Sequence, residues 1–282
     1  MKKEIQQIFM NELKEKVVDI KDVSRGVDQI VKIVQTENST YIIKLPKKDV
    51  AELLMREYIA CKKLNGLGSI PKFVAKNNKY LIEEFIPGYH LDEVSLNLTE
   101  KKNVYKELGT ILKKIHSISM EGYGSVGVDG KGKDLTLKDR VFHNRNENLK
   151  YLKENFLLEK EYLQLLDYLK NNDFYADSRE SVMLHFDFAE QNIKINNKKV
   201  VGILDFGDLS AGPLAFDLAR LFIGHSGDDV FQYFLKGYGK VDLNEVKYYS
   251  VINLLWMLPY HHKINKNKKR IELELKVLNE II

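Results

Sequence analysis

The spacing of apolar and polar positions in the first third of the chain predicts a small α/β unit. Residues 2–16 carry apolar side chains at helical spacing, and residues 49–64 repeat this pattern. Short apolar runs bounded by polar turn residues predict strands at residues 27–34, 40–45, 72–75 and 79–85. We therefore expect a mostly antiparallel sheet that carries a helix, ending near residue 86.

The pattern changes to long helical periodicity after Ile86-Pro87-Gly88. Helices are predicted over residues 99–117, 149–171 and 242–260. This change divides the chain into a lobe of residues 1–86 and a larger helical lobe of residues 87–282. A glycine-rich run at residues 121–132 interrupts the helices, and it fits either a surface loop or small hairpin, or a mobile loop near the substrate.

The segment from His185 to Asp208 contains the most informative chemistry. Between Asn192 and Asp205, a short alternating run, an Asn-rich polar turn and an apolar run predict a β-hairpin. An antiparallel hairpin returns to its starting point, so Asn192 and Asp205 are expected side by side at its open end. An amide oxygen and a carboxylate form a hard-oxygen site suited to Mg²⁺, which keeps part of its shell for water and phosphate.

Two more charged positions complete the requirements of phosphoryl transfer from ATP, which depends on positioning and on stabilising phosphate charge. Asp187 precedes the hairpin, and we assign it to orient the attacking hydroxyl and accept its proton. Lys44, at the end of an apolar strand, is assigned to the phosphates. Glu57 on the following helix is its expected partner, with Glu52 as the alternative.

These residues resemble the core of a known enzyme family. His185-Phe186-Asp187 followed by Asn192, and then Leu204-Asp205-Phe206-Gly207-Asp208, is similar to the catalytic and metal-binding core of the aminoglycoside phosphotransferases and related choline kinase-like small-molecule kinases. The resemblance implies an α+β class and a bilobal protein-kinase-like fold. Its small N-lobe would hold an antiparallel sheet, its larger C-lobe would be mainly helical, and ATP would bind between them. Asp217 matches a family aspartate that supports the catalytic loop.

The resemblance also implies how the nucleotide is held. The nucleotide loop would include Ser24 and Gly26, and backbone groups near Glu84 and Ile86 would recognise adenine. Family members use ATP and, in some cases, GTP. One departure from the family lies in the catalytic loop, where many members carry glycine at the position of Phe186.

The acceptor is expected to be a small molecule with a hydroxyl, and an aminoglycoside-type antibiotic is the first expectation. A metabolite of the choline, ketosamine, methylthioribose or homoserine type is the alternative, and a nucleotide-binding pseudokinase is a third. A cationic aminoglycoside would need carboxylates, and Trp256 could stack on a sugar ring. Four acidic residues could contribute to that site: Asp228, Asp229, Glu272 and Glu274.

Composition and charge narrow the classes of protein to which this chain can belong. The 282 residues are 44% hydrophobic and 30% charged, with a net charge of +4 and basic residues spread along the chain, so nucleic-acid binding is not expected. The longest apolar stretch is shorter than the ~20 residues of a membrane helix. A start without a signal-peptide pattern and a single cysteine, Cys61, indicate the cytoplasm. In the absence of a heptad repeat we expect a monomer.

Overall fold

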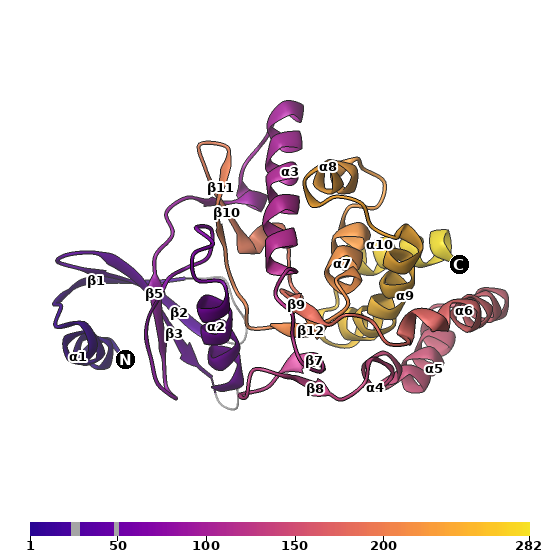
Figure 1. The fold of residues 1–282 in the computed structure, drawn as a ribbon, viewed down its shortest axis with the longest axis horizontal. Coiled ribbons are helices and arrows are strands. Elements are labelled where there is room, and N and C mark those ends of the chain that lie inside the picture. The colour runs from indigo at the N-terminus through magenta and orange to yellow at the C-terminus, as the bar shows by residue number, and fades with distance from the viewer. Residues whose placement is uncertain (24–28, 48–50) are drawn as a thin grey trace. The chain divides into compact units, whose positions relative to one another are not determined.

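A computed structural model describes residues 1–23, 29–47 and 51–282, which form two compact units (Figure 1). The first unit comprises residues 1–95, 127–130 and 190–209, and the second comprises residues 96–126, 131–189 and 210–282. The first unit thus continues to Ser95 and includes the hairpin segment, which the predicted boundary at residue 86 had assigned to the other lobe. The α+β class is confirmed.

A five-stranded antiparallel sheet forms the centre of the first unit, with strand order β1-β2-β3-β5-β4. The strands are β1 (Val17–Asp22), β2 (Gln29–Thr36), β3 (Thr40–Pro46), β4 (Phe73–Lys76) and β5 (Leu81–Glu84). The pattern-based prediction was correct for four of these strands and missed β1.

Two helices pack on opposite faces of this sheet. Helix α1 (Lys2–Leu13) buries Ile5 and Phe9 in a cluster that includes Ile43 of β3. Successive strand residues point to opposite faces, so Lys44 faces the other side, where helix α2 (Ala51–Lys63) supplies Glu57 as its partner. The alternation of β3 therefore separates an apolar face from a face with buried charge.

The predicted hairpin is present in the first unit. Strands β10 (Ile193–Asn196) and β11 (Lys199–Ile203) pair antiparallel, with Ile193 opposite Ile203. Strand β6 (Tyr89–His90) adds to the β10 side, giving the order β11-β10-β6. Short 3₁₀ turns precede both β10 and the second unit, at Glu190–Asn192 and Leu91–Glu93.

The second unit is mainly helical. Its helices are α3 (Leu98–Ile115), α4 (Leu137–Phe142), α5 (Arg145–Asn155), α6 (Glu159–Asn172), α7 (Ala215–Gly224), α8 (Val230–Tyr238), α9 (Leu243–Tyr260) and α10 (Lys268–Ile281), with a 3₁₀ turn at Asp173–Ala176 and a π-helical turn at His261–Asn265. A small sheet has the order β8-β7-β12-β9. Its strands are β7 (Tyr123–Val126), β8 (Gly132–Asp134), β9 (Val182–Leu184) and β12 (Ser210–Gly212). The glycine-rich run therefore forms the small hairpin β7–β8.

One predicted helix is wrong, because residues 149–171 do not form a continuous helix. The chain leaves helical geometry at Phe156 and buries Leu157. A new helix then starts after Leu158, whose backbone N–H donates to the side chain of Glu161 at 2.8 Å. This cap satisfies one of the N–H groups that a helix start leaves without a partner.

Close packing of α3 against α8 depends on two glycines. A Cβ at Gly109 would collide with the carbonyl oxygen of Phe234, and one at Gly237 would collide with that of Lys106. The two backbones approach at these points because both side chains are absent. No helix among the described residues is long and apolar enough to cross a membrane.

Candidate active site

Lys44 lies in a buried ionic cluster of the first unit. Its Nζ is 2.7 Å from Oε1 of Glu57 and 3.1 Å from Oε1 of Glu83, and at most 8% of any of the three side chains is exposed. The sequence interpretation gave Glu57 as the partner, and the structure places it there. Glu52, the alternative, instead pairs with Arg56 at 3.1 Å.

Sequence reasoning missed Glu83. It lies on β5 directly opposite Ile42, two positions before Lys44 on the same face of β3, so the two side chains are diagonal neighbours across the strands. The signal was an acidic residue at a core-facing position of an otherwise apolar strand. Such a residue needs a cation because an unpaired buried charge is costly.

The electrostatics of this cluster keep the lysine protonated. Burial favours the neutral amine, but the pKa of Lys44 is raised because the carboxylates of Glu57, Glu83 and Asp205 outweigh that effect. Burial raises the pKa of Glu57, and the ammonium of Lys44 opposes this shift. The ammonium is thus held as a fixed positive charge at the end of β3.

Helix α2 also holds the segment that follows Asp205. The backbone N–H of Phe206 donates to Oε2 of Glu57 at 3.3 Å, and Nη1 of Arg56 donates to the carbonyl oxygen of Gly207 at 3.2 Å. Consecutive residues of one helix, Arg56 and Glu57, therefore bind the backbone of consecutive residues of this loop. Asp205 itself has a φ of 65°, a left-handed conformation that is uncommon outside glycine.

The hairpin brings the two expected metal ligands together. Next to the pair Ile193–Ile203, the backbone N–H of Leu204 donates to the carbonyl oxygen of Asn192 at 2.8 Å. Asp205 is the next residue after Leu204, so it lies close to Asn192. The side chains provide an amide oxygen and a carboxylate, the donor types that suit Mg²⁺. No group of three or more His, Cys, Asp or Glu side chains in the described residues is arranged to hold a metal ion.

The predicted nucleotide contacts are placed in part. Ser24 and Gly26 lie outside the described residues. The backbone N–H of Glu84 donates to the carbonyl oxygen of Lys72 at 2.9 Å. The backbone group of Glu84 that could contact adenine is therefore its carbonyl oxygen. The side chain of Ile86 packs over Gly202.

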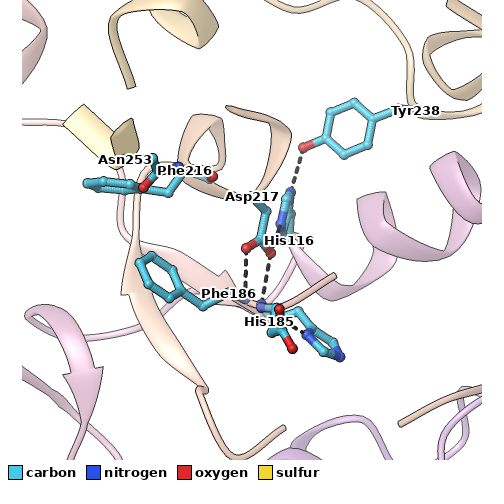
Figure 2. Close-up of polar contacts among 8 residues, drawn as sticks. His116, His185, Phe186, Phe216, Asp217, Tyr238 and Asn253 are labelled. Atoms are coloured by element: carbon cyan, nitrogen blue, oxygen red, sulfur yellow. Dashed lines mark hydrogen bonds and ion pairs between the residues drawn. The ribbon is translucent and has the colours of Figure 1, made fainter. Parts of the chain in front are cut away.

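In the second unit, buried Asp217 organises the loop that carries Asp187 (Figure 2). Its carboxylate accepts the backbone N–H groups of His185 and Phe186, both at 2.8 Å. Nε2 of His116 lies 3.0 Å from the same carboxylate, and Nδ1 of His116 is 2.7 Å from the hydroxyl of Tyr238. Burial alone would raise the pKa of Asp217, but the contacts with His116 and His185 lower it, so the carboxylate stays ionised.

This brace fixes an unusual backbone at Phe186, whose φ is 64°. A left-handed conformation is disfavoured for a bulky residue and costs about 1–3 kcal/mol. The hydrogen bonds from the N–H groups of His185 and Phe186 to Asp217 hold the two peptide groups that lead into this residue. The departure from the family glycine is thus a strained residue beside Asp187.

Asp187 itself is half-buried at the end of the braced loop. Its backbone N–H donates to Nδ1 of His185 at 3.3 Å, so the imidazole supports the loop. Its Oδ1 lies 3.6 Å from Nη2 of Arg220, and 28% of the Asp187 side chain is exposed. The carboxylate is therefore oriented by a cation and still accessible.

Three of the four acidic residues considered for a cationic acceptor are engaged elsewhere. Glu274 is fully buried and pairs with Arg270 at 2.9 Å and with His261 at 2.8 Å. Asp228 accepts the N–H of Val230 at 2.8 Å, and Asp229 accepts the hydroxyl of Tyr233 at 3.1 Å. These carboxylates have structural contacts that a bound cation would have to displace.

Comparisons with known proteins agree on the fold. The family model APH, described as the phosphotransferase enzyme family, matches residues 19–249. No curated protein matches the chain in sequence.

Solved structures are similar over nearly their whole length. The aminoglycoside phosphotransferase APH(4)-Ia gives a TM-score of 0.76 at 16% identity, covering 100% of this chain and 98% of that one. The streptomycin–ATP complex of APH(2'')-IIa gives 0.70 at 21% identity, with 100% and 98% covered. A thermostable APH(4)-Ia mutant with AMP-PNP and hygromycin B gives 0.75 at 16% identity, with 98% and 97% covered. The kinase-like fold is therefore confirmed.

Proposed function

The chain belongs to the phosphotransferase enzyme family, and on this premise we propose that it transfers the γ-phosphate of ATP to a hydroxyl of a small molecule in a Mg²⁺-dependent reaction. Membership of this family makes the chain a kinase-type enzyme. The proposal rests above all on Glu57, which binds both Lys44 at 2.7 Å and the peptide N–H that follows Asp205 at 3.3 Å. A phosphate-binding cation and a metal ligand are thus held in one unit by one carboxylate.

In this proposal Lys44 binds the phosphates of the nucleotide. The ammonium is preorganised by Glu57 and Glu83, so little reorganisation is needed when the nucleotide arrives. Glu83 and Asp205 act on the same ammonium, so this cluster has net negative charge even where the raised pKa of Glu57 leaves that side chain protonated. A metal ion would offset that charge, which supports the assignment of Asp205 and Asn192 as its ligands.

Asn192 and Asp205 would hold the Mg²⁺, which supplies neutralisation of phosphate charge when bound. The protein's own contribution is to fix the ligands. The β10–β11 register places Asn192, and the contacts of Arg56 and Glu57 place the residues after Asp205. Ser24, Gly26, Glu84 and Ile86 are proposed to contribute to the nucleotide site, with ATP as the phosphate donor and GTP as the alternative donor.

Asp187 is proposed to orient the acceptor hydroxyl and take its proton. Its accessible carboxylate supports this role, because a general base must reach the proton that it accepts. Asp217 and His116 act through the loop and touch no reacting atom, so they are positioning residues.

Two acceptor classes are supported by different observations. An aminoglycoside-type acceptor is supported by the fold, since the solved relatives named above include complexes with hygromycin B and streptomycin. A metabolite acceptor is favoured by the engagement of Asp228, Asp229 and Glu274 in structural contacts, which leaves less negative charge for a polycation. We also propose a cytoplasmic monomer, in which the single thiol of Cys61 is buried.

A coupled ADP-release screen tests the activity. Purified protein is given ATP and Mg²⁺ with aminoglycosides, choline, ketosamines, methylthioribose and homoserine, and ADP is followed with and without each compound. The proposal predicts ADP release that depends on one acceptor and disappears when EDTA is added. ATP consumption that no acceptor increases would contradict it.

A further inference from the structure

A chain of contacts leads from Asp187 to two arginines and two aromatic rings in the second unit. We call Arg140, Phe186, Arg220 and Trp256 the arginine–aromatic cluster. The guanidinium of Arg220, which contacts Asp187, lies 5.3 Å from the ring centre of Phe186. The guanidinium of Arg140 lies 5.5 Å from the same ring and 4.4 Å from that of Trp256. Each member is partly exposed, so the cluster is a surface beside Asp187 and not part of the core.

The glycine-rich run creates the room for Arg140. Gly124 on β7 has a φ of 76°, and a Cβ there would lie 3.2 Å from Cδ of Arg140 and would collide with the carboxylate of Asp134. Helix α4, which carries Arg140, is fixed by its own cap, where the hydroxyl of Thr136 accepts the N–H of Asp139 at 3.1 Å. The glycine-rich run thus allows the side chain of Arg140 to pack against β7 at Gly124.

Arg140 has N–H donors for which no described residue supplies an acceptor. In the part of the chain that the structure describes, its guanidinium forms no hydrogen bond and no ion pair. A guanidinium has five N–H donors and stays protonated at neutral pH. Burial lowers the pKa of Arg140, and Asp134 opposes this shift from beyond ion-pair distance. A half-buried guanidinium that contacts two rings and has no bonded carboxylate among the described residues can still bind an anion.

We infer that Arg140, stacked on Trp256, binds an anionic group of the acceptor, so that the acceptor carries a carboxylate or phosphate besides its reactive hydroxyl. This inference rests on the proposed kinase activity and selects among its acceptors. A guanidinium fork binds such groups in a bidentate manner, and an aromatic ring beneath it keeps the fork oriented. Arg220 reinforces the positive potential while it positions Asp187.

The same geometry disfavours a polycationic acceptor. Two guanidiniums lie around Phe186, next to the residue that would receive the acceptor hydroxyl. A positively charged acceptor group would be repelled by these guanidiniums. The repulsion is stronger than in water because the dielectric constant near the protein is lower. Hydroxy acids therefore fit the cluster better than aminoglycosides or choline.

The test compares matched acceptors on the wild-type enzyme and on Arg140 variants. Homoserine and its carboxamide differ only in the anionic group, and gentamicin and choline serve as cationic acceptors. We expect ADP release with the anionic member of the pair and a much higher KM for its amide. Arg140→Gln should raise the KM of the anionic acceptor about 10- to 100-fold, while the KM for ATP stays unchanged.

Two controls separate charge recognition from packing. Arg140→Lys keeps the charge and should recover part of the loss, whereas a packing role would leave the Lys and Gln variants alike. Lys138→Gln on the same helix removes an exposed lysine that pairs with Asp177 at 2.7 Å, and it should behave as wild type. Trp256 is the only tryptophan of the chain, so its fluorescence reports acceptor binding at Arg140 directly.

The outcomes are distinguishable. If ADP release is acceptor-dependent but prefers cations or uncharged acceptors, or if homoserine and its amide react equally, the inference is overturned and the kinase activity stands. If no acceptor increases ADP release, the proposed function fails and takes this inference with it. The wild-type comparison decides the matter even if an Arg140 variant fails to fold.

Discussion

Phe206 and Glu57 are joined by a hydrogen bond from the backbone N–H of Phe206 to Oε2 of Glu57, 3.3 Å long and spanning 149 positions of sequence. The other oxygen of Glu57 binds Lys44. One buried carboxylate thus couples the proposed phosphate-binding lysine to the loop that carries Asp205. Substitutions of Glu57 should therefore affect nucleotide binding more strongly than proton transfer from the acceptor.

Replacing Glu57 by Gln tests that coupling. The amide keeps the shape but removes the charge that orients Lys44, and a hydrogen bond to a charged group contributes about 1.5–3 kcal/mol. We expect the KM for ATP to rise roughly 10- to 100-fold. Glu52→Gln on the same helix changes an exposed acid that pairs with Arg56, and it should leave the KM close to wild type. Equal effects of the two substitutions would refute the special position of Glu57.

Replacing Asp205 by Ala tests the proposed metal site without relying on turnover. The variant should still bind ADP in the presence of EDTA, but Mg²⁺ should no longer strengthen that binding in calorimetric titrations. Asn192→Ala should weaken the Mg²⁺ effect less, because an amide oxygen carries no net charge. A normal Mg²⁺ response in Asp205→Ala would remove this residue from the metal site.

Replacing Asp187 by Ala or Asn tests the proposed general base. Turnover should fall by roughly 10²–10⁴, the usual contribution of a positioned base. ADP affinity and thermal unfolding should change little, because Asp217 braces the loop through the N–H groups of His185 and Phe186. Unchanged turnover would exclude Asp187 from the reaction.

Replacing Asp217 by Asn tests the brace and predicts a pH dependence. The folded-state pKa of Asp217 is lowered, so the carboxylate stabilises the fold fully above its ordinary value near 4, and that contribution is lost as the pH falls through the lower folded pKa. Asp217→Asn should lower the free energy of unfolding at pH 7 by about 2–4 kcal/mol. The gap to wild type should narrow below about pH 4 in urea denaturation series.

The matched control is Asp167→Asn on α6, an exposed position whose carboxylate accepts only a side-chain hydrogen bond from Asn171 among the contacts described. It should change stability by less than about 0.5 kcal/mol at either pH. A gap for Asp217→Asn that stays constant down to pH 3 would show that folding does not lower the pKa of Asp217.

The prediction of the site from sequence was strongest where the contacts are local. The β10–β11 hairpin returns within a few residues, so turn chemistry and alternation sufficed to place Asn192 beside Asp205. Helix α2 follows β3 directly, which made Glu57 a natural partner for Lys44. The proposed roles of these residues in catalysis stay predictions until the variants are measured.

Prediction was weakest where side chains meet across elements. The single-helix prediction for residues 149–171 failed because the burial of Leu157 and the cap at Glu161 outweighed helical periodicity. The contact between Glu83 and Lys44 was not predicted because it depends on the pairing of β3 with β5, which places the two side chains diagonally across the strands. The contacts of Arg140 with Phe186 and Trp256 were not predicted because these residues are far from Arg140 in the sequence.

The sequence by itself determined four strands of the five-stranded sheet, helices α1, α2, α3 and α9, the family, and the acidic and amide residues at the open end of the hairpin, because periodicity and turn residues act over a few positions. Only the tertiary structure decided which carboxylates surround Lys44, how Asp217 and His116 hold the loop that carries Asp187, and that Arg220 contacts Asp187. Those contacts join residues far apart along the chain. Burial makes them strong, and burial is a property of the folded molecule.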